Sequence, residues 1–163
     1  MVRATILSGL TLLALGGPAS AQTATACPPQ IEKTADCWSG QDQNGAHYWI
    51  AKPKQWNGVL IVHSHGGPRL APVWPRKSIK DLARFSVFVR AGYAMVGTSY
   101  RHAGWGAHMA VADTENARRI FVDHIGKPRV TIEHGQSWGG NVAAKLNETL
   151  AATRTASAFM MAC

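Results

Sequence analysis

The sequence has few cysteines, few acidic residues and no apolar run long enough to cross a membrane. Of its 163 residues, 3 are cysteine and 9 are aspartate or glutamate, against 17 lysine or arginine. The apolar stretch from Ile6 to Leu15 is shorter than the about 20 residues of a membrane-spanning helix, and no later stretch is long enough. The basic residues are scattered rather than clustered, so the net charge of +8 favours solubility over nucleic-acid binding. We therefore expect no membrane span and no nucleic-acid partner.

The first 21 residues have the three parts of a secretory signal peptide. Arg3 gives a positive start, Ile6 to Leu15 an apolar core, and Ala19-Ser20-Ala21 the small-residue cleavage pattern. We expect cleavage after Ala21 and a secreted or periplasmic protein. An uncleaved anchor or a buried helix is the alternative.

Export would place the three cysteines where disulfides persist. Cys27 and Cys37 are ten positions apart, so we predict a local disulfide that contributes roughly 2–3 kcal/mol. The odd count leaves one thiol over. Cys163 is then free, or pairs outside this chain, or pairs with one of the other two and the local disulfide is wrong.

Strand and helix patterns alternate after a polar N-terminal segment. Residues 22–45 are expected to form an N-terminal extension and 46–163 the folded domain. We predict strands at 46–51, 58–65, 93–100, 129–134 and 156–163, and helices at 78–91, 109–125 and 141–153. This alternation predicts an α/β fold with parallel strands and right-handed crossovers. Because the chain stops within its last apolar run, we expect a fragment; a complete small domain with an edge strand is the alternative.

The segment Gly135-Gln136-Ser137-Trp138-Gly139 matches the pattern G-x-S-x-G. It lies between a predicted strand and a predicted helix, where a nucleophile elbow requires a sharp, strained turn. Glycines on either side of the serine remove Cβ atoms that would clash, and the helix dipole favours developing negative charge. We predict that Ser137 is the nucleophile and that Gly135 and Gly139 form the elbow. A simple strand-to-helix turn is the alternative.

A second glycine-rich segment, His65-Gly66-Gly67-Pro68, ends the strand predicted at 58–65. Acyl transfer needs two preorganised N–H donors for its oxyanion, and losing one costs about 10²–10³ in rate. We assign one donor to Trp138 and the other to Gly67, since Pro68 has no N–H.

Four features carry a family resemblance: the His-Gly-Gly-Pro run, Gly92-Tyr93-Ala94, Ser99-Tyr100-Arg101, and Gly-Gln-Ser-Trp-Gly-Gly. Over about Tyr48 to Cys163 the chain resembles secreted bacterial α/β-hydrolases of the esterase and prolyl-oligopeptidase-like type. The resemblance implies a mostly parallel sheet with flanking helices, truncated after about the strand that follows the nucleophile helix. It also implies hydrolysis of small-molecule carboxylic esters or related acyl substrates. We expect no cofactor.

The family's triad runs Ser, then Asp or Glu, then His along the chain. After Ser137 the sequence has no Asp and no His, and its one acidic residue, Glu148, falls in a predicted helix. The acid and the base are therefore expected to be missing from this chain. We expect His134 to pack beside the sheet. His102 and His108 lie in a loop and depart from the family order, so no histidine is assigned as base.

Other residue patterns are less specific. His63 and His65 share one face of a strand, as metal ligands do, but no further ligand follows closely, so we expect no metal. Trp74 and Trp105 follow strands on the ligand-binding side of an α/β sheet and are candidates to line an acyl or aromatic pocket. Ordinary loop packing is the alternative.

We therefore predict a serine hydrolase whose acid and base lie beyond Cys163. The alternative is a catalytically inert remnant or a small-ligand binding module of the same fold. The substrate, the choice between esterase and peptidase, and the oligomeric state stay open.

Overall fold

The computed structural model describes residues 22–67, 70, 73–150 and 157–162. The predicted signal peptide, residues 1–21, lies outside the described residues, as do Pro68 and Cys163. Within the described part, no helix has the length and apolar character needed to cross a membrane.

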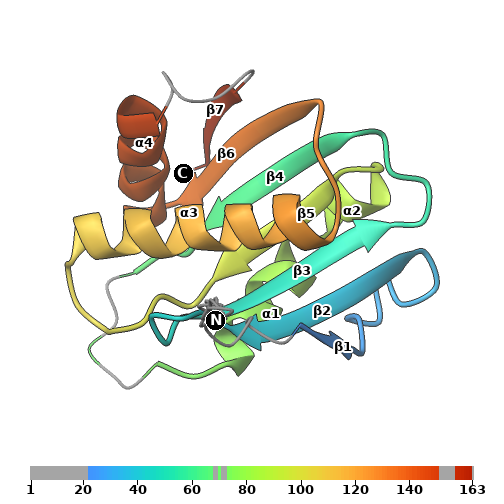
Figure 1. The fold of residues 1–163 in the computed structure, drawn as a ribbon, viewed down its shortest axis with the longest axis horizontal. Helices are drawn as coiled ribbons and strands as arrows, with labels where there is room; N and C mark the ends of the chain where they lie inside the picture. Colours follow the sequence, from blue (N-terminus) through green and yellow to red (C-terminus); the bar gives the residue numbers. More distant parts are fainter. Residues whose placement is uncertain (1–21, 68–69, 71–72, 151–156, 163) are drawn as a thin grey trace, which may run out of the picture.

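One sheet organises the described chain, with the strand order β1-β2-β3-β5-β4-β6-β7 (Figure 1). The strands are β1 Thr23–Thr25, β2 Ala35–Gln41, β3 His47–Pro53, β4 Val59–Ser64, β5 Ala94–Thr98, β6 Val130–Gln136 and β7 Ser157–Ala162. Strands β5, β4, β6 and β7 pair in parallel, whereas β1, β2, β3 and β5 pair antiparallel. The predicted α/β class is confirmed, and an antiparallel side is added to it.

The antiparallel side begins within the segment that the sequence pattern predicts to be an extension. Residues 22–45 contain β1 and β2, and β2 pairs with β3 over its whole length. These strands escape sequence patterns because β1 is short and β2 buries only Ala35 and Cys37. The predicted disulfide between Cys27 and Cys37 is confirmed, with Cα atoms 5.3 Å apart.

Helices cover both faces of the sheet. They are α1 Arg76–Arg84, α2 Ser86–Arg90, α3 Ala107–His124 and α4 Trp138–Leu150. Helices α3 and α4 lie on one face, with α1 and α2 on the other (Figure 1). The single helix predicted at 78–91 is wrong, because the chain breaks at Phe85, whose φ is −100°. The Phe85 ring turns inward onto His63 and His134, a long-range contact that overrides the local periodicity.

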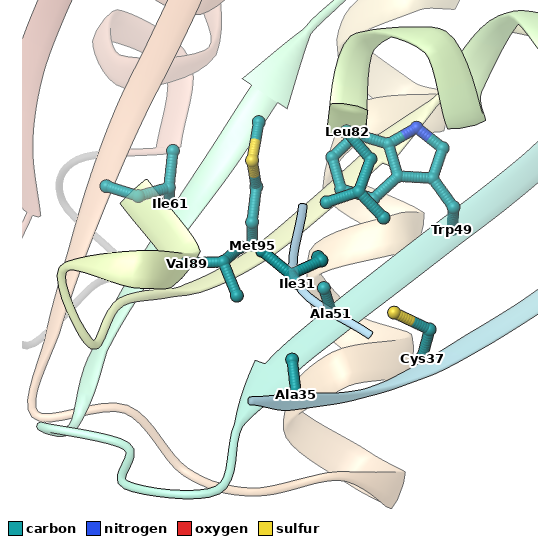
Figure 2. Close-up of a cluster of buried hydrophobic side chains, with 9 residues drawn as sticks. All are labelled: Ile31, Ala35, Cys37, Trp49, Ala51, Ile61, Leu82, Val89 and Met95. Carbon is teal, nitrogen blue, oxygen red and sulfur yellow. The ribbon is translucent and has the colours of Figure 1, made fainter. Parts of the chain in front are cut away.

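Alternate strand residues supply two cores. Figure 2 shows the cluster on the side of α1 and α2: Ile31, Ala35, Cys37, Trp49, Ala51, Ile61, Leu82, Val89 and Met95. On the opposite face Tyr48 and Ile50 of β3 join Phe121 of α3 and Leu146 of α4. Each fully buried large apolar side chain contributes about 1.5–3 kcal/mol. This double burial fixes the carboxyl ends of β4 and β6, where the candidate site lies.

Candidate active site

Ser137 lies alone on the turn between β6 and α4. It is exposed, and its φ of 53° is in the left-handed region. Among the described non-glycine residues, only Ser137 and Tyr100 have a positive φ. Such backbone costs on the order of 1–3 kcal/mol and persists where the surroundings impose it. The turn therefore holds Ser137 out at the carboxyl end of β6, one residue before α4 begins.

Two glycines make this turn possible. A Cβ atom on Gly135 would lie 2.1 Å from the carbonyl oxygen of Gly139, and one on Gly139 would lie 2.2 Å from that of Ser64. Both clashes are with backbone atoms, which cannot rotate away. The strand, the turn and the helix are thus packed so closely around Ser137 that no larger residue fits at either position.

The glycine-rich segment after β4 approaches the same turn. A Cβ atom on Gly66 would lie 2.9 Å from the carbonyl oxygen of Gln136, the residue before Ser137. Gly67 follows with a φ of 118°. The structure therefore brings the Gly66 end of this segment against the turn, next to Trp138 at the start of α4.

Asp81 of α1 joins this region, and no sequence motif pointed to it. His65 Nδ1 donates a hydrogen bond to Asp81 Oδ2, and His63 Nε2 lies 3.4 Å from the same oxygen. His63 Nδ1 in turn lies 2.8 Å from His134 Nδ1. Asp81 is 16 residues from His65 and on a helix, so only the folded chain brings the two together.

The charges in this cluster follow from burial and hydrogen bonding. Burial opposes ionisation of Asp81, but the nearby His63 imidazole and the hydrogen bond from His65 outweigh it and hold the pKa of Asp81 below its usual range. Burial lowers the pKa of His63. Burial together with the neighbouring His63 lowers the pKa of His134 to about 4. At neutral pH Asp81 is therefore charged, whereas His63 and His134 are neutral.

The predicted packing of His134 is confirmed. It is 1% exposed, and its ring stacks on His63 and meets Phe85 and Phe88 edge-on. Residues His102 and His108 are exposed, the latter in α3. Within the described chain, no histidine is hydrogen-bonded to Ser137.

The other predicted candidates are placed as follows. Glu148 is exposed on α4 and pairs with Lys145 at 3.6 Å. The side chains of His63 and His65 share Asp81, yet in the part of the chain that the structure describes no group of three or more His, Cys, Asp or Glu residues could hold a metal ion. Trp74 is 58% exposed.

Tyr100 is the second residue with a positive φ, at 58°, directly after β5 and Ser99. Its hydroxyl donates to the carbonyl oxygen of His65 at 3.0 Å. Burial raises the pKa of Tyr100 above its usual range, so the hydroxyl stays a donor. The Tyr100 ring meets Trp138 edge-on at 5.7 Å, and Trp138 meets Trp105 edge-on at 6.3 Å. Tyr100 is buried and Trp105 is 70% exposed, so the rings of Tyr100, Trp138 and Trp105 form a row that extends from the protein interior to the solvent.

An ion pair that the sequence analysis missed anchors the loop after β5. The guanidinium and the backbone N–H of Arg101 both donate to Asp113 of α3, whose side chain is fully buried. The neighbouring Tyr100 is thereby held in place.

No protein-family model matches the chain. An esterase from the bacterial hormone-sensitive lipase family superposes with a TM-score of 0.57 and 19% identity, over 79% of this chain and 43% of that one. DphMB1 superposes with a TM-score of 0.60 and 21% identity, over 85% and 46%. The chain has the α/β-hydrolase fold.

A sequence relative of this chain is the o-phthalyl amidase of Xanthobacter agilis, 27% identical over 112 residues. The match covers 67% of this chain and 23% of the amidase. The chain thus spans less than half the length of each of these three proteins. The turn at Ser137 joins a strand to a helix, β6 to α4.

Proposed function

We propose that this chain supplies the nucleophile and the oxyanion hole of a serine hydrolase that acts on carboxylic esters or related acyl substrates. Ser137 attacks the acyl carbon as its proton passes to a base, and the N–H groups of Trp138 and Gly67 stabilise the oxyanion that forms. The oxyanion then collapses, the bond to the alcohol or amine breaks as that leaving group takes up the proton, and water hydrolyses the acyl-serine ester. The observation that carries the proposal is the exposed serine at φ 53° on a turn that only glycines allow. The N-terminus of α4 at the next residue favours the developing negative charge.

A serine hydroxyl is a weak nucleophile until a base removes its proton. His134 is buried against His63 and two phenylalanines, and Glu148 is turned to solvent with Lys145, so neither fits the role of base or acid. In this proposal the acid and the base come from outside the printed sequence, in the order that the fold uses after its serine.

The aromatic side chains favour an acyl group that is itself aromatic. The Trp138 ring, which follows Ser137 in the chain, lies edge-on to the buried Tyr100 and to the exposed Trp105, and an edge-on aromatic contact adds about 0.5–1.5 kcal/mol beyond area burial. The name of the related o-phthalyl amidase refers to an aromatic acyl group, which supports the same substrate class.

A second candidate function is a binding module without turnover. It is favoured by the absence, among the described residues, of any histidine bonded to Ser137. Such a module would use the same aromatic rings to hold a small ligand.

Acylation by p-nitrophenyl acetate separates the two candidates. The chain is incubated with this ester and with imidazole as an added base, and the Ser137 peptide is examined by mass spectrometry. We expect an acetyl adduct on Ser137, with p-nitrophenol released faster than from the variant Ser137→Ala under the same conditions. Equal release from both proteins, with no adduct, would refute the hydrolase proposal for this chain and leave the binding module.

The aromatic preference is tested with p-nitrophenyl benzoate. Trp105→Ala is expected to reduce acylation by the benzoate more than by the acetate, because only the aromatic acyl group contacts the rings. Val87→Ala is the control, since Val87 is also an exposed apolar side chain but lies on α2. An equal loss with both esters would contradict the preference.

A further inference from the structure

We propose that Asp81 is a positioning residue: it orients His65 and, through His65, holds the Gly66-Gly67 backbone against the turn that carries Ser137. This role rests on the proposed function, because a fixed Gly67 N–H matters only if it stabilises an oxyanion.

The hydrogen positions in the cluster follow from its geometry. A carboxylate only accepts hydrogen bonds, so His65 Nδ1 donates to Asp81. His63 Nε2 lies 3.4 Å from the same oxygen without forming a hydrogen bond to it, and the negative charge of the carboxylate favours a hydrogen on that nitrogen. A neutral His63 then has no hydrogen on Nδ1. The 2.8 Å contact therefore requires His134 Nδ1–H to donate to His63. His134 thus donates to His63, whose Nε2 faces the Asp81 carboxylate, and His65 donates to the same carboxylate oxygen.

His65 is held at two points. Asp81 binds its imidazole, and the Tyr100 hydroxyl binds its carbonyl oxygen at 3.0 Å. The backbone of His65 is also packed tightly against α4, because its carbonyl oxygen and carbon lie 2.6 and 2.8 Å from the position that a Cβ atom on Gly139 would occupy. A rotation of His65 would thus move the backbone that packs on the first turn of α4 and carries Gly66 and Gly67.

At position 81 a carboxylate contributes a directional hydrogen bond rather than buried apolar surface. The next residue, Leu82, is 2% exposed in the core and already anchors α1. The side chain of Asp81 is 13% exposed, and an apolar side chain of similar size in such a position often stabilises a fold equally well. The charge-assisted hydrogen bond instead fixes the tautomer and the ring orientation of His65, as carboxylates behind metal-binding histidines do. Oxyanion donors need such support, since their effect depends on holding position.

The test compares Asp81→Asn, which keeps the shape, with Asp81→Leu, which removes the acceptor of the His65 hydrogen bond. Lys80→Ala is the matched control, because Lys80 is the exposed neighbour on α1. NMR spectra of the ¹⁵N-labelled chain report the protonated nitrogen of each imidazole and the exchange rate of the Gly67 amide. Circular dichroism verifies that each variant is folded.

In the unsubstituted chain we expect hydrogen on Nδ1 of His65, Nε2 of His63 and Nδ1 of His134. In Asp81→Leu the His65 signature should be lost and the Gly67 amide should exchange at least about tenfold faster, since its support is gone. Asp81→Asn should fall between, and Lys80→Ala should match the unsubstituted chain. A folded Asp81→Leu with an unchanged Gly67 amide would overturn the proposal.

The NMR readout separates this proposal from the hydrolase proposal. Ser137→Ala should leave the imidazole signature unchanged, so the positioning of Gly67 can be judged even if Ser137 is never acylated. If Ser137 is acylated, Asp81→Leu should slow acylation by about 10²–10³, the loss expected for one oxyanion donor. Acylation at an unchanged rate in that folded variant would also overturn the positioning role.

Discussion

Alanine at Gly135 is expected to destabilise the folded chain by at least about 3 kcal/mol, the upper end of the cost of overpacking. Its Cβ would lie 2.1 Å from Gly139 O, 2.4 Å from Gly139 C and 2.6 Å from Gly140 N. Unstrained carbon contacts are about 3.5 Å or longer, so β6 and α4 would have to separate by roughly 1 Å. Neither can yield easily, because Gly135 pairs with β4 at Ser64 and with β7 at Met161.

Thermal unfolding followed by circular dichroism measures this cost. For a chain of this size 1 kcal/mol corresponds to about 3 °C, so Gly135→Ala should lower Tm by about 10 °C. Gly106→Ala is the control, because its φ is −68° and its Cβ would meet no atom closer than 3.5 Å. We expect the control to melt within about 2 °C of the unsubstituted chain, as surface substitutions do. A Gly135→Ala variant that melts equally close would refute the inference that backbone packing imposes the turn at Ser137.

Three further predictions concern stability. Replacing Cys27 by alanine should lower the free energy of unfolding in urea by about 2–3 kcal/mol, because the ten-residue disulfide loop no longer constrains the unfolded chain. Replacing Arg101 by alanine should cost about 2–3 kcal/mol in the same assay, since the buried Asp113 carboxylate keeps only a backbone donor. Lowering the pH from 6.5 to 4 should destabilise the chain, because His134 binds its proton in the unfolded state near 6.5 but in the folded state only near 4. A shift of that size corresponds to on the order of 3 kcal/mol in urea titrations across this range.

Each of these three predictions has a control variant or an outcome that would contradict it. Arg119→Ala should cost under about 0.5 kcal/mol, because that side chain is 65% exposed in its pair with Glu115; equal costs for both arginines would contradict the role given to burial. His134→Gln should flatten the pH dependence between 6.5 and 4, and an unchanged slope would exclude His134 as its source. If Cys27→Ala unfolds at the same urea concentration as the unsubstituted chain, the disulfide contributes no stability.

Local patterns were sufficient wherever the physical cause is local. The apolar run at 58–65 predicts β4, and the β-branched run at 129–134 predicts β6, because strands buried on both faces need continuous apolar residues. The turn at Ser137 is also predictable from a local pattern. Ser137 has a positive φ, and the backbone approaches so closely on either side of it that only glycine fits at positions 135 and 139.

The sequence by itself therefore predicted the succession of the main strands along the chain, the place of the strand-to-helix turn and the burial of His134, and it favoured the local disulfide among the possible pairings. The tertiary structure alone decided the break at Phe85, the two antiparallel strands before residue 46, and the meeting of Asp81 and Tyr100 at His65. These features depend on contacts between residues far apart along the chain. Because an aspartate on a helix or a tyrosine after a strand has the same local pattern whatever it meets, only the folded sheet reveals that both support the glycine-rich loop beside Ser137.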